Sequence, residues 1–369
     1  MEQQNRTGTR QSNFELLRII AMLMIVAHHF SFHGGFRFAA DTVTLNRVWV
    51  QFLEAGGKTG VNLFVLISGY FMVDSLRLKT GRILRLWFQL FTYSLLVYVI
   101  FTLCRGKSLD AIALIKCALP LTWNKWWFAS AYLVLCMIAP FINRLLQSMD
   151  RKQYLEYLAV LTVIWCLVPT VTHQYWESNF LVWFIYVYSI AGYLRLHRIR
   201  AALKASSCIL LSLLLILLIW LSAVVFDLLG TRWPIFAAHT DFFYLLQSLP
   251  VLLSAVLMFT GFSKLTLKPS RFINLLASTA FGIYLFHDNE LLRPFIWKKL
   301  FRVSAYQDSS LLIPFSLAVI LAVFLGSMLV ELVRKYTLEK LADRPLSALA
   351  GKLDRAAEKI SSSSLFRKL

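Results

Sequence analysis

The side chains best suited to chemistry lie in one apolar stretch near the start of the chain, NFELLRIIAMLMIVAHHFSFH, residues 13 to 33. As a helix, it places Arg18 and His29 within about 20° of one face and about 16 Å apart along the axis. Glu15 and His33 fall on the same stripe, whereas His28 points about 80° away. A histidine can accept a proton near neutral pH, and an arginine can hold an anionic group. The stripe therefore indicates proton transfer beside anion binding.

An ionisable stripe within an apolar stretch has two interpretations. An arginine inside a membrane span is costly and tends to face a bundle interior or a wet cavity, so Arg18 and His29 form a hypothesis for a functional site. In the structural alternative, Arg18 snorkels to the inner interface and pairs with Glu15, while His29 is a hydrogen-bonded core histidine. Spacing alone favours neither interpretation.

A second polar pattern lies in GVNLFVLISGYFM, residues 60 to 72, which is short for a membrane span and has glycines at and near its ends. Its polar side chains include Asn62, Ser68 and Tyr70. The small-residue turn at Ser68 and Gly69 permits close approach of a ligand or of another helix backbone. We expect this segment to pack inside the protein, where it lines either a site or a helix contact.

Basic residues follow this segment directly. Arg82 and Arg85 are three residues apart and would share a helix face. Their two guanidinium groups could hold phosphates together. The concentration of positive charge on the cytoplasmic side of a membrane explains the same residues without a ligand.

Two further motifs bring aromatic and histidine side chains to the opposite side. In WNKWWFASAYLVLCMIAP, residues 123 to 140, Trp126 and Trp127 fit either an interfacial aromatic belt or a platform for stacking a sugar. In FGIYLFHDNELLR, residues 281 to 293, Tyr284 and His287 fall in the outer half of a predicted span. Because His29 also lies in the outer half of its span, we expect the two histidines to meet at one depth.

The composition dictates the elements that must position these residues. The chain is 58% hydrophobic and 15% charged, with a mean hydropathy of +0.64, whereas soluble domains have about a quarter of their residues charged. Apolar stretches of about 20 residues recur along the sequence, which predicts an all-α membrane bundle and excludes a soluble fold. Ten spans are predicted, near residues 14–33, 59–73, 84–103, 127–147, 155–171, 178–196, 207–226, 242–261, 272–292 and 309–334.

Charge distribution predicts the orientation. The net charge is +19, from 38 basic and 19 acidic residues. In a membrane protein this charge belongs to cytoplasmic loops beside anionic lipid, so we expect no nucleic-acid partner. The basic residues are concentrated in the segments that are cytoplasmic if both termini lie inside. We expect a cytoplasmic tail over residues 1–12, a transmembrane domain over 13–336 and a basic cytoplasmic tail over 337–369. The five cysteines lack metal-type spacing, and we expect no metal.

Together these segments resemble the membrane-bound acyltransferase 3 family, the O-acetyltransferases of bacterial surface and extracellular polysaccharides. The match comprises Arg18 with ten residues before His29, the GV-LF-L-SGY segment with the following RILRL, the WWF-A-YL-L-AP segment and FGIYLFH. It extends from about residue 13 to 335. The resemblance implies that Arg18 and His29 are the pair required for activity and that Arg82 and Arg85 lie near a CoA donor. The family often has an acidic residue where this chain has Asn62.

The resemblance implies transfer of an acyl group, most simply acetyl from cytosolic acetyl-CoA, to a hydroxyl of a cell-envelope glycan at the bacterial inner membrane. His29 would act as general base or acyl acceptor, and Arg18 would orient the donor or the oxyanion. A transporter or flippase of such glycans, and a sensor or scaffold, are the competing classes. The remaining expected assignments are Ser68 and Tyr70 near the donor, Trp126, Trp127, Tyr284, His287 and His33 near the acceptor, and Glu15 and Asn62 in support.

Overall fold

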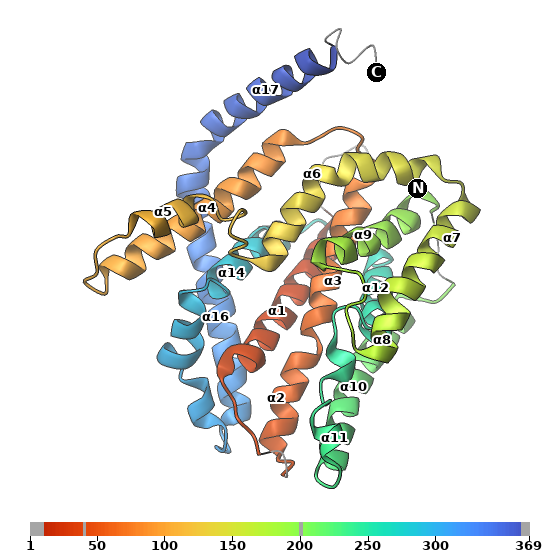
Figure 1. The fold of residues 1–369 in the computed structure, drawn as a ribbon, viewed down its shortest axis with the longest axis vertical. Coiled ribbons are helices and arrows are strands. Elements are labelled where there is room, and N and C mark those ends of the chain that lie inside the picture. The colour runs from red at the N-terminus through yellow and green to blue at the C-terminus, as the bar shows by residue number, and fades with distance from the viewer. Residues whose placement is uncertain (1–10, 40–41, 199–201, 363–369) are drawn as a thin grey trace.

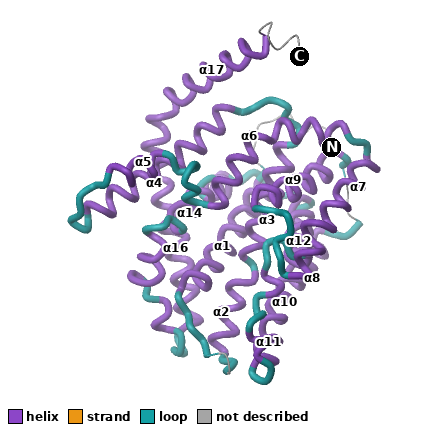
Figure 2. The backbone as a smooth tube through the Cα atoms, in the orientation of Figure 1, coloured by secondary structure: helices purple, strands orange, loops and turns teal. Residues whose placement is uncertain are grey.

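The computed structural model describes residues 11–39, 42–198 and 202–362, and helices are the regular structure throughout these ranges (Figure 2). The helices of eight or more residues are α1 (Ser12–Gly34), α2 (Leu45–Ala55), α3 (Gly57–Met72), α4 (Thr80–Leu103), α5 (Ala111–Ala118), α6 (Trp127–Ser148), α7 (Arg151–Thr162), α9 (Phe180–Leu196), α10 (Ala205–Gly230), α12 (Leu249–Ser263), α14 (Ala280–His287), α16 (Leu312–Arg334) and α17 (Lys340–Ser362). The shorter ones are α8 (Val168–Thr172), α11 (Pro234–Ala237), α13 (Arg271–Ala277) and α15 (Leu292–Pro294).

The predicted all-α membrane fold is confirmed. Within the described residues, 7 helical segments are long and apolar enough to cross a bilayer, and the predicted count of ten is not confirmed. Two predicted spans form helices of 16 and 17 residues, α3 and α9. The 7 segments are Ser12–Gly34, Thr80–Leu103, Trp127–Ser148, Arg151–Thr172, Ala205–Gly230, Pro234–Ser263 and Leu312–Lys359.

The prediction of one continuous span over residues 272–292 is wrong. The chain turns between α13 and α14, where the Ser278 and Thr279 hydroxyls donate to the carbonyls of Leu275 and Leu276. Such local bonds from serine and threonine compete with a regular helix. Helix α14 then ends at His287. His287 is therefore the last residue of a short helix, whereas the sequence predicted it in the outer half of a continuous span.

Helix α2 lies in a segment that the sequence interpretation treated as an outer connection. Its first residue follows Thr44, whose side-chain oxygen accepts from the Arg47 N–H and caps the helix. Arg47 also forms a 2.5 Å ion pair with Asp227, which is fully buried at the end of α10. At eleven residues, the helix is shorter than the roughly 20 residues that cross a bilayer.

The ends of the bundle follow from contacts between distant segments. Ser12 donates to Asn274, and Thr80 donates to Asp354 of α17. Lys335, in the segment just before α17, donates to Ser278, which directly follows α13. The start of α1 therefore lies at the same end as α17, which extends from the top of the bundle in Figure 1. We call the end that contains Ser12 and Thr80 the proximal end, and the end that contains Gly34 the distal end. Both described ends of the chain are proximal, as the predicted topology requires.

Helix α3 is packed inside the protein, as its glycines predicted. It contacts α1, α9 and α12, and most of its side chains are buried. A Cβ added at Gly60 would lie 2.7 Å from the Ala21 carbonyl oxygen of α1, and one added at Gly69 would lie 2.9 Å from the Tyr188 carbonyl oxygen of α9. The two glycines therefore allow α3 to pack against the backbones of two neighbours, which supports the helix-contact interpretation of this motif.

Replacing Gly60 with leucine should separate α1 from α3. The new side chain would meet backbone that cannot rotate away, so we expect the free energy of unfolding to fall by about 1–3 kcal/mol. The melting temperature in detergent measures this loss. Gly326→Leu in α16 is the matched control, because a Cβ there meets nothing within 4 Å. Equal melting temperatures for the two variants would contradict the close contact.

Candidate active site

The centre of the candidate site is a pair of buried histidines. His29 Nδ1 of α1 and His287 Nε2 at the end of α14 lie 2.8 Å apart, within hydrogen-bond distance. His287 is fully buried, and its Nδ1 lies 2.6 Å from the Ile283 carbonyl oxygen. The expected meeting of these two histidines at one depth is confirmed. The sequence predicted that His287 lies near the acceptor. Both of its ring nitrogens are engaged, so neither is free to bind an acceptor.

A second polar pair borders the first on its distal side. The His33 ring lies one turn along α1 from His29, with ring centroids 4.9 Å apart. His33 Nε2 lies 3.4 Å from the Asp288 carboxylate, which also accepts a 3.3 Å bond from Arg293. Asp288 is buried, so its negative charge is held next to the histidines in a medium where charges interact strongly.

His29, His33 and Asp288 form the one group in the described residues whose donor atoms could surround a metal ion, with all three atoms within 4.8 Å of one another. His33 Nε2 and the Asp288 carboxylate are 3.4 Å apart, a spacing that tetrahedral zinc with ligands at about 2.0–2.1 Å could accept. The absence of a metal remains a prediction from the sequence.

Arg18 lies toward the proximal end of the same helix and pairs with Glu15 at 3.0 Å. The structural alternative, in which Arg18 has no functional role, predicted this pairing. However, the arginine side chain keeps 26% of its surface exposed, and the second Glu15 oxygen, Oε2, is buried without a partner. Side chains on a helix lean toward its N-terminus, so Arg18 leans away from His29, whose Cα lies about 16 Å further along the axis.

Arg18 is close to a series of hydrogen-bonded polar groups that connects α3 to α4 through Tyr132 of α6. Arg82 donates to the Tyr132 hydroxyl at 3.3 Å, and Tyr132 bonds Ser68 Oγ at 2.9 Å. Ser68 donates in turn to the Phe64 carbonyl, so its hydroxyl is already engaged. The Tyr132 hydroxyl lies within electrostatic range of Arg18 as well as Arg82. The structure therefore brings Arg18 and Arg82 to one proximal region.

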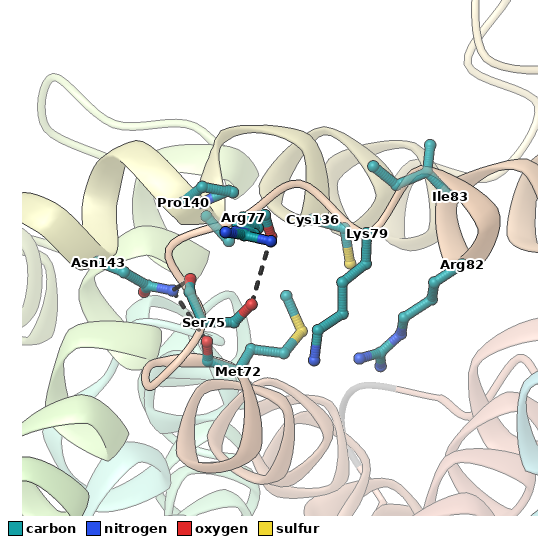
Figure 3. Close-up of a pocket in the computed structure, with 10 residues that line it drawn as sticks. Met72, Ser75, Arg77, Lys79, Arg82, Ile83, Cys136, Pro140 and Asn143 are labelled. Atoms are coloured by element: carbon teal, nitrogen blue, oxygen red, sulfur yellow. Dashed lines mark hydrogen bonds between the residues drawn. The ribbon is translucent and has the colours of Figure 1, made fainter. Parts of the chain in front are cut away.

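A recess opens beside Arg82 at the proximal end. Its lining includes Arg77, Lys79 and Arg82. Figure 3 shows the charged ends of Lys79 and Arg82 side by side at this recess. Cys136 and Asn143 of α6 also line the recess. Three cations on one concave surface suit a ligand that bears several phosphates.

Two residues predicted near the donor lie elsewhere. Arg85 forms a 2.8 Å ion pair with Asp343 of α17, so the pair Arg82 and Arg85 does not act as one fork in this structure. Tyr70 is separated from Ser68 by about 200° around α3. It packs against Phe14, and the Arg195 guanidinium lies 5.1 Å from its ring centre. Tyr70 therefore contributes to helix packing, away from the recess.

The residues expected near the acceptor separate into covered and accessible groups. Trp126 is 2% exposed and its indole N–H has no partner, so its ring face is not open to a sugar. Trp127 is half-buried and packs on Phe180 at 4.3 Å. Tyr284 is buried near His287, and its hydroxyl lies next to the Asp288 side chain. The sugar platform expected from both tryptophans is thus reduced to Trp127.

Asn62 has a structural position. Its Nδ2 donates to the Leu246 carbonyl at 3.2 Å, and its Oδ1 accepts from the Trp183 indole at 2.9 Å. The side chain is fully buried and both of its polar ends are engaged. A neutral amide satisfies this site, and a carboxylate would lack the donor that Leu246 requires. At this position the chain needs no charge.

Sequence interpretation missed three residues around the site. Asp288 directly follows His287, and this acidic neighbour was a usable signal. Tyr132 lies within the tryptophan-rich motif but gave no sign that it would connect Ser68 to Arg82. Lys58 is half-buried at the start of α3, with its Nζ 5.8 Å from the Phe32 ring centre, and its charge acts on His29. In the sequence, the glycines near Lys58 were the only signal that it would lie close to the site.

The comparisons with known proteins agree with this arrangement. A family model described as an acyltransferase domain matches residues 11–332, a range that includes α1, the histidine pair and the proximal recess. Curated proteins and solved structures give no match. The chain therefore belongs to the acyltransferase 3 family of membrane acyltransferases.

Proposed function

We propose that this protein transfers an acyl group, most simply acetyl, from cytosolic acyl-CoA to a hydroxyl of a cell-envelope glycan at a bacterial inner membrane. The observation that carries this proposal is the buried pair of His29 and His287, in which His29 lies on the α1 stripe that also holds Arg18. A histidine enclosed in a membrane bundle and hydrogen-bonded to a second histidine is suited to proton transfer, not to lipid contact.

The donor would enter from the proximal end. Acyl-CoA carries its phosphates at one end and its thioester at the end of a long flexible arm. The phosphates match the cationic recess of Arg77, Lys79 and Arg82. Arg18 lies on the proximal side of His29 along α1, where it could hold the arm or its amide carbonyls. At about 16 Å from His29 along the helix, Arg18 is too far away to bind the oxyanion there, so we assign it to the donor.

The reaction can be written with the residues at the distal end. The acceptor hydroxyl loses its proton to His29 as its oxygen bonds to the thioester carbon, and collapse of the tetrahedral intermediate breaks the carbon–sulfur bond. The thiolate of CoA leaves and takes the proton from His29, which restores the neutral ring. The Tyr284 hydroxyl, buried near His287 and next to Asp288, is suited to donate to the carbonyl oxygen as it gains charge.

The acceptor would bind from the distal side. Trp127 offers part of an aromatic surface, and Lys58 adds a cation near His29. His33 and Asp288 supply hydrogen-bonding groups next to the reacting histidine. Polar groups with an aromatic surface are common means of holding a sugar in a site, and they support a glycan acceptor.

Purified protein in nanodiscs, supplied with radiolabelled acetyl-CoA and lipid-linked or soluble glycans, tests the proposal. We expect labelled glycan and free CoA to form in equal amounts, while protein-free nanodiscs form neither. In sealed proteoliposomes, donor supplied from one side should acetylate acceptor enclosed on the other. Movement of glycan across the membrane without release of CoA would instead establish a transporter and refute the proposal.

A further inference from the structure

The fully buried His287 has its two ring nitrogens in different hydrogen bonds. Its Nδ1 lies 2.6 Å from the Ile283 carbonyl oxygen, and its Nε2 lies 2.8 Å from His29 Nδ1. A carbonyl oxygen only accepts hydrogen bonds, so His287 Nδ1 must carry a hydrogen. In a neutral imidazole the other nitrogen then has a lone pair and no hydrogen. His287 Nε2 is therefore an acceptor.

This assignment determines where the proton lies on His29. A 2.8 Å contact with an acceptor nitrogen requires a donor, so His29 Nδ1 carries the hydrogen. His29 Nε2 is then left with its lone pair. Hydrogen bonds thus run in one direction, from His29 to His287 to the Ile283 carbonyl. A positively charged His287 would reverse the first bond, but its ring is enclosed and its two hydrogen bonds reach only His29 and Ile283.

We propose that His287 is a positioning residue that fixes the tautomer and the orientation of His29, so that His29 Nε2 is presented as the base. The inference rests on the proposed function only for the identity of the reaction. The arrangement corresponds to the orienting carboxylate of hydrolase triads, with a neutral imidazole bonded to a backbone carbonyl in place of the carboxylate.

The proton movements balance around this relay. His29 Nε2 takes the hydroxyl proton of the acceptor, and His29 then carries a hydrogen on each nitrogen. Its Nδ1–H stays bonded to His287 Nε2, so the ring cannot rotate while it is charged. His29 Nε2 next gives its proton to the departing thiolate. His287 exchanges no net proton in the cycle, which separates its role from that of His29.

Two substitutions that differ by one methylene test the positioning role. In His287→Gln, the side-chain carbonyl oxygen reaches the position of the imidazole Nε2 and can still accept from His29. In His287→Asn, the amide reaches only the position of Nδ1. Loss of an orienting partner typically costs about 10- to 100-fold, so we expect the asparagine variant to lose that much in kcat and the glutamine variant to retain most of it.

His239 provides the matched control. It also lies close to the carbonyl four residues earlier, with Nδ1 2.7 Å from the Ile235 oxygen, but it is exposed and has no second histidine partner. Its glutamine and asparagine variants should retain equal activity. A merely structural role of the histidine-to-carbonyl bond at His287 would be satisfied by asparagine and would reverse the expected ranking of the two His287 variants.

Nitrogen-15 NMR of histidine-labelled protein reads the tautomer without any turnover. Signals of His29 are assigned by their loss in His29→Gln. We expect a protonated Nδ1 and an unprotonated Nε2 in the native chain and in His287→Gln, and loss of that preference in His287→Asn. A native His29 with hydrogen on Nε2 would overturn the inference even if acyl transfer is intact. A protein with the expected tautomer and no acyl transfer would refute the proposed function alone. If the asparagine variant fails to fold, the native spectrum still decides.

Discussion

Replacing His29 with glutamine is expected to reduce kcat for acyl transfer by about 10²- to 10⁴-fold, the usual contribution of a general base. Glutamine has a similar reach but cannot take a proton. Acyl-CoA affinity should stay within a few-fold, because the donor is assigned to the proximal recess and Arg18. Single-turnover rates and equilibrium binding of acyl-CoA, measured on the same preparation, separate the two quantities.

The neighbouring histidine is the matched control for His29. His28 is also buried, but its ring points to α2, where its Nδ1 contacts the Glu54 carbonyl at 3.2 Å. His28→Gln should retain at least a tenth of the native rate, since its effect would come only through packing beneath Gly57. A His29 variant that works as fast as the native chain, or a His28 variant that is the inactive one, would contradict the assignment of the base.

Helical periodicity was sufficient to predict the site along α1. The spacing of Arg18 and His29 fixes their shared face in any regular helix, and both residues lie on the interior stripe. Depth in the membrane was enough to predict that His29 and His287 would meet, because both fall in the outer half of a predicted span, although the structure breaks the span that holds His287 into two short helices. The helix face of a residue and its depth in the membrane can both be predicted from one sequence, because each depends on residues of a single segment.

The parts that could not be predicted depend on partners far along the chain. Trp126 was expected at an interface, but its ring is covered, which only the packed bundle reveals. Arg85 was expected to act with Arg82, but Asp343, 258 residues away, engages it. The break at Ser278 was hidden because apolar composition continues through it. Apolar composition indicates burial, whereas a turn depends on local hydrogen bonds from side chains that composition does not weigh.

The second large effect is expected at Arg18. If this arginine holds the donor arm, Arg18→Gln should reduce kcat/KM for acyl-CoA by about 10- to 150-fold, the loss of a charged hydrogen-bonding partner worth about 1.5–3 kcal/mol. The parameter kcat/KM for the glycan, measured at saturating donor, should change much less. Lysine at this position keeps the charge but has no planar fork, so Arg18→Lys should recover only part of the loss.

Glu15 complicates this prediction and also sharpens it. Its carboxylate is buried and bonded to Arg18, so removal of the arginine would leave an unpaired charge that destabilises the fold. The double variant Arg18→Gln with Glu15→Gln removes that penalty. If donor binding alone depends on Arg18, the double variant should regain thermal stability but not kcat/KM for acyl-CoA. Arg144→Gln, at an exposed position near the proximal end of α6, should change neither quantity. Recovery of full activity in the double variant would show that Arg18 serves only to neutralise Glu15, because a donor-binding arginine cannot be replaced by removing its internal partner.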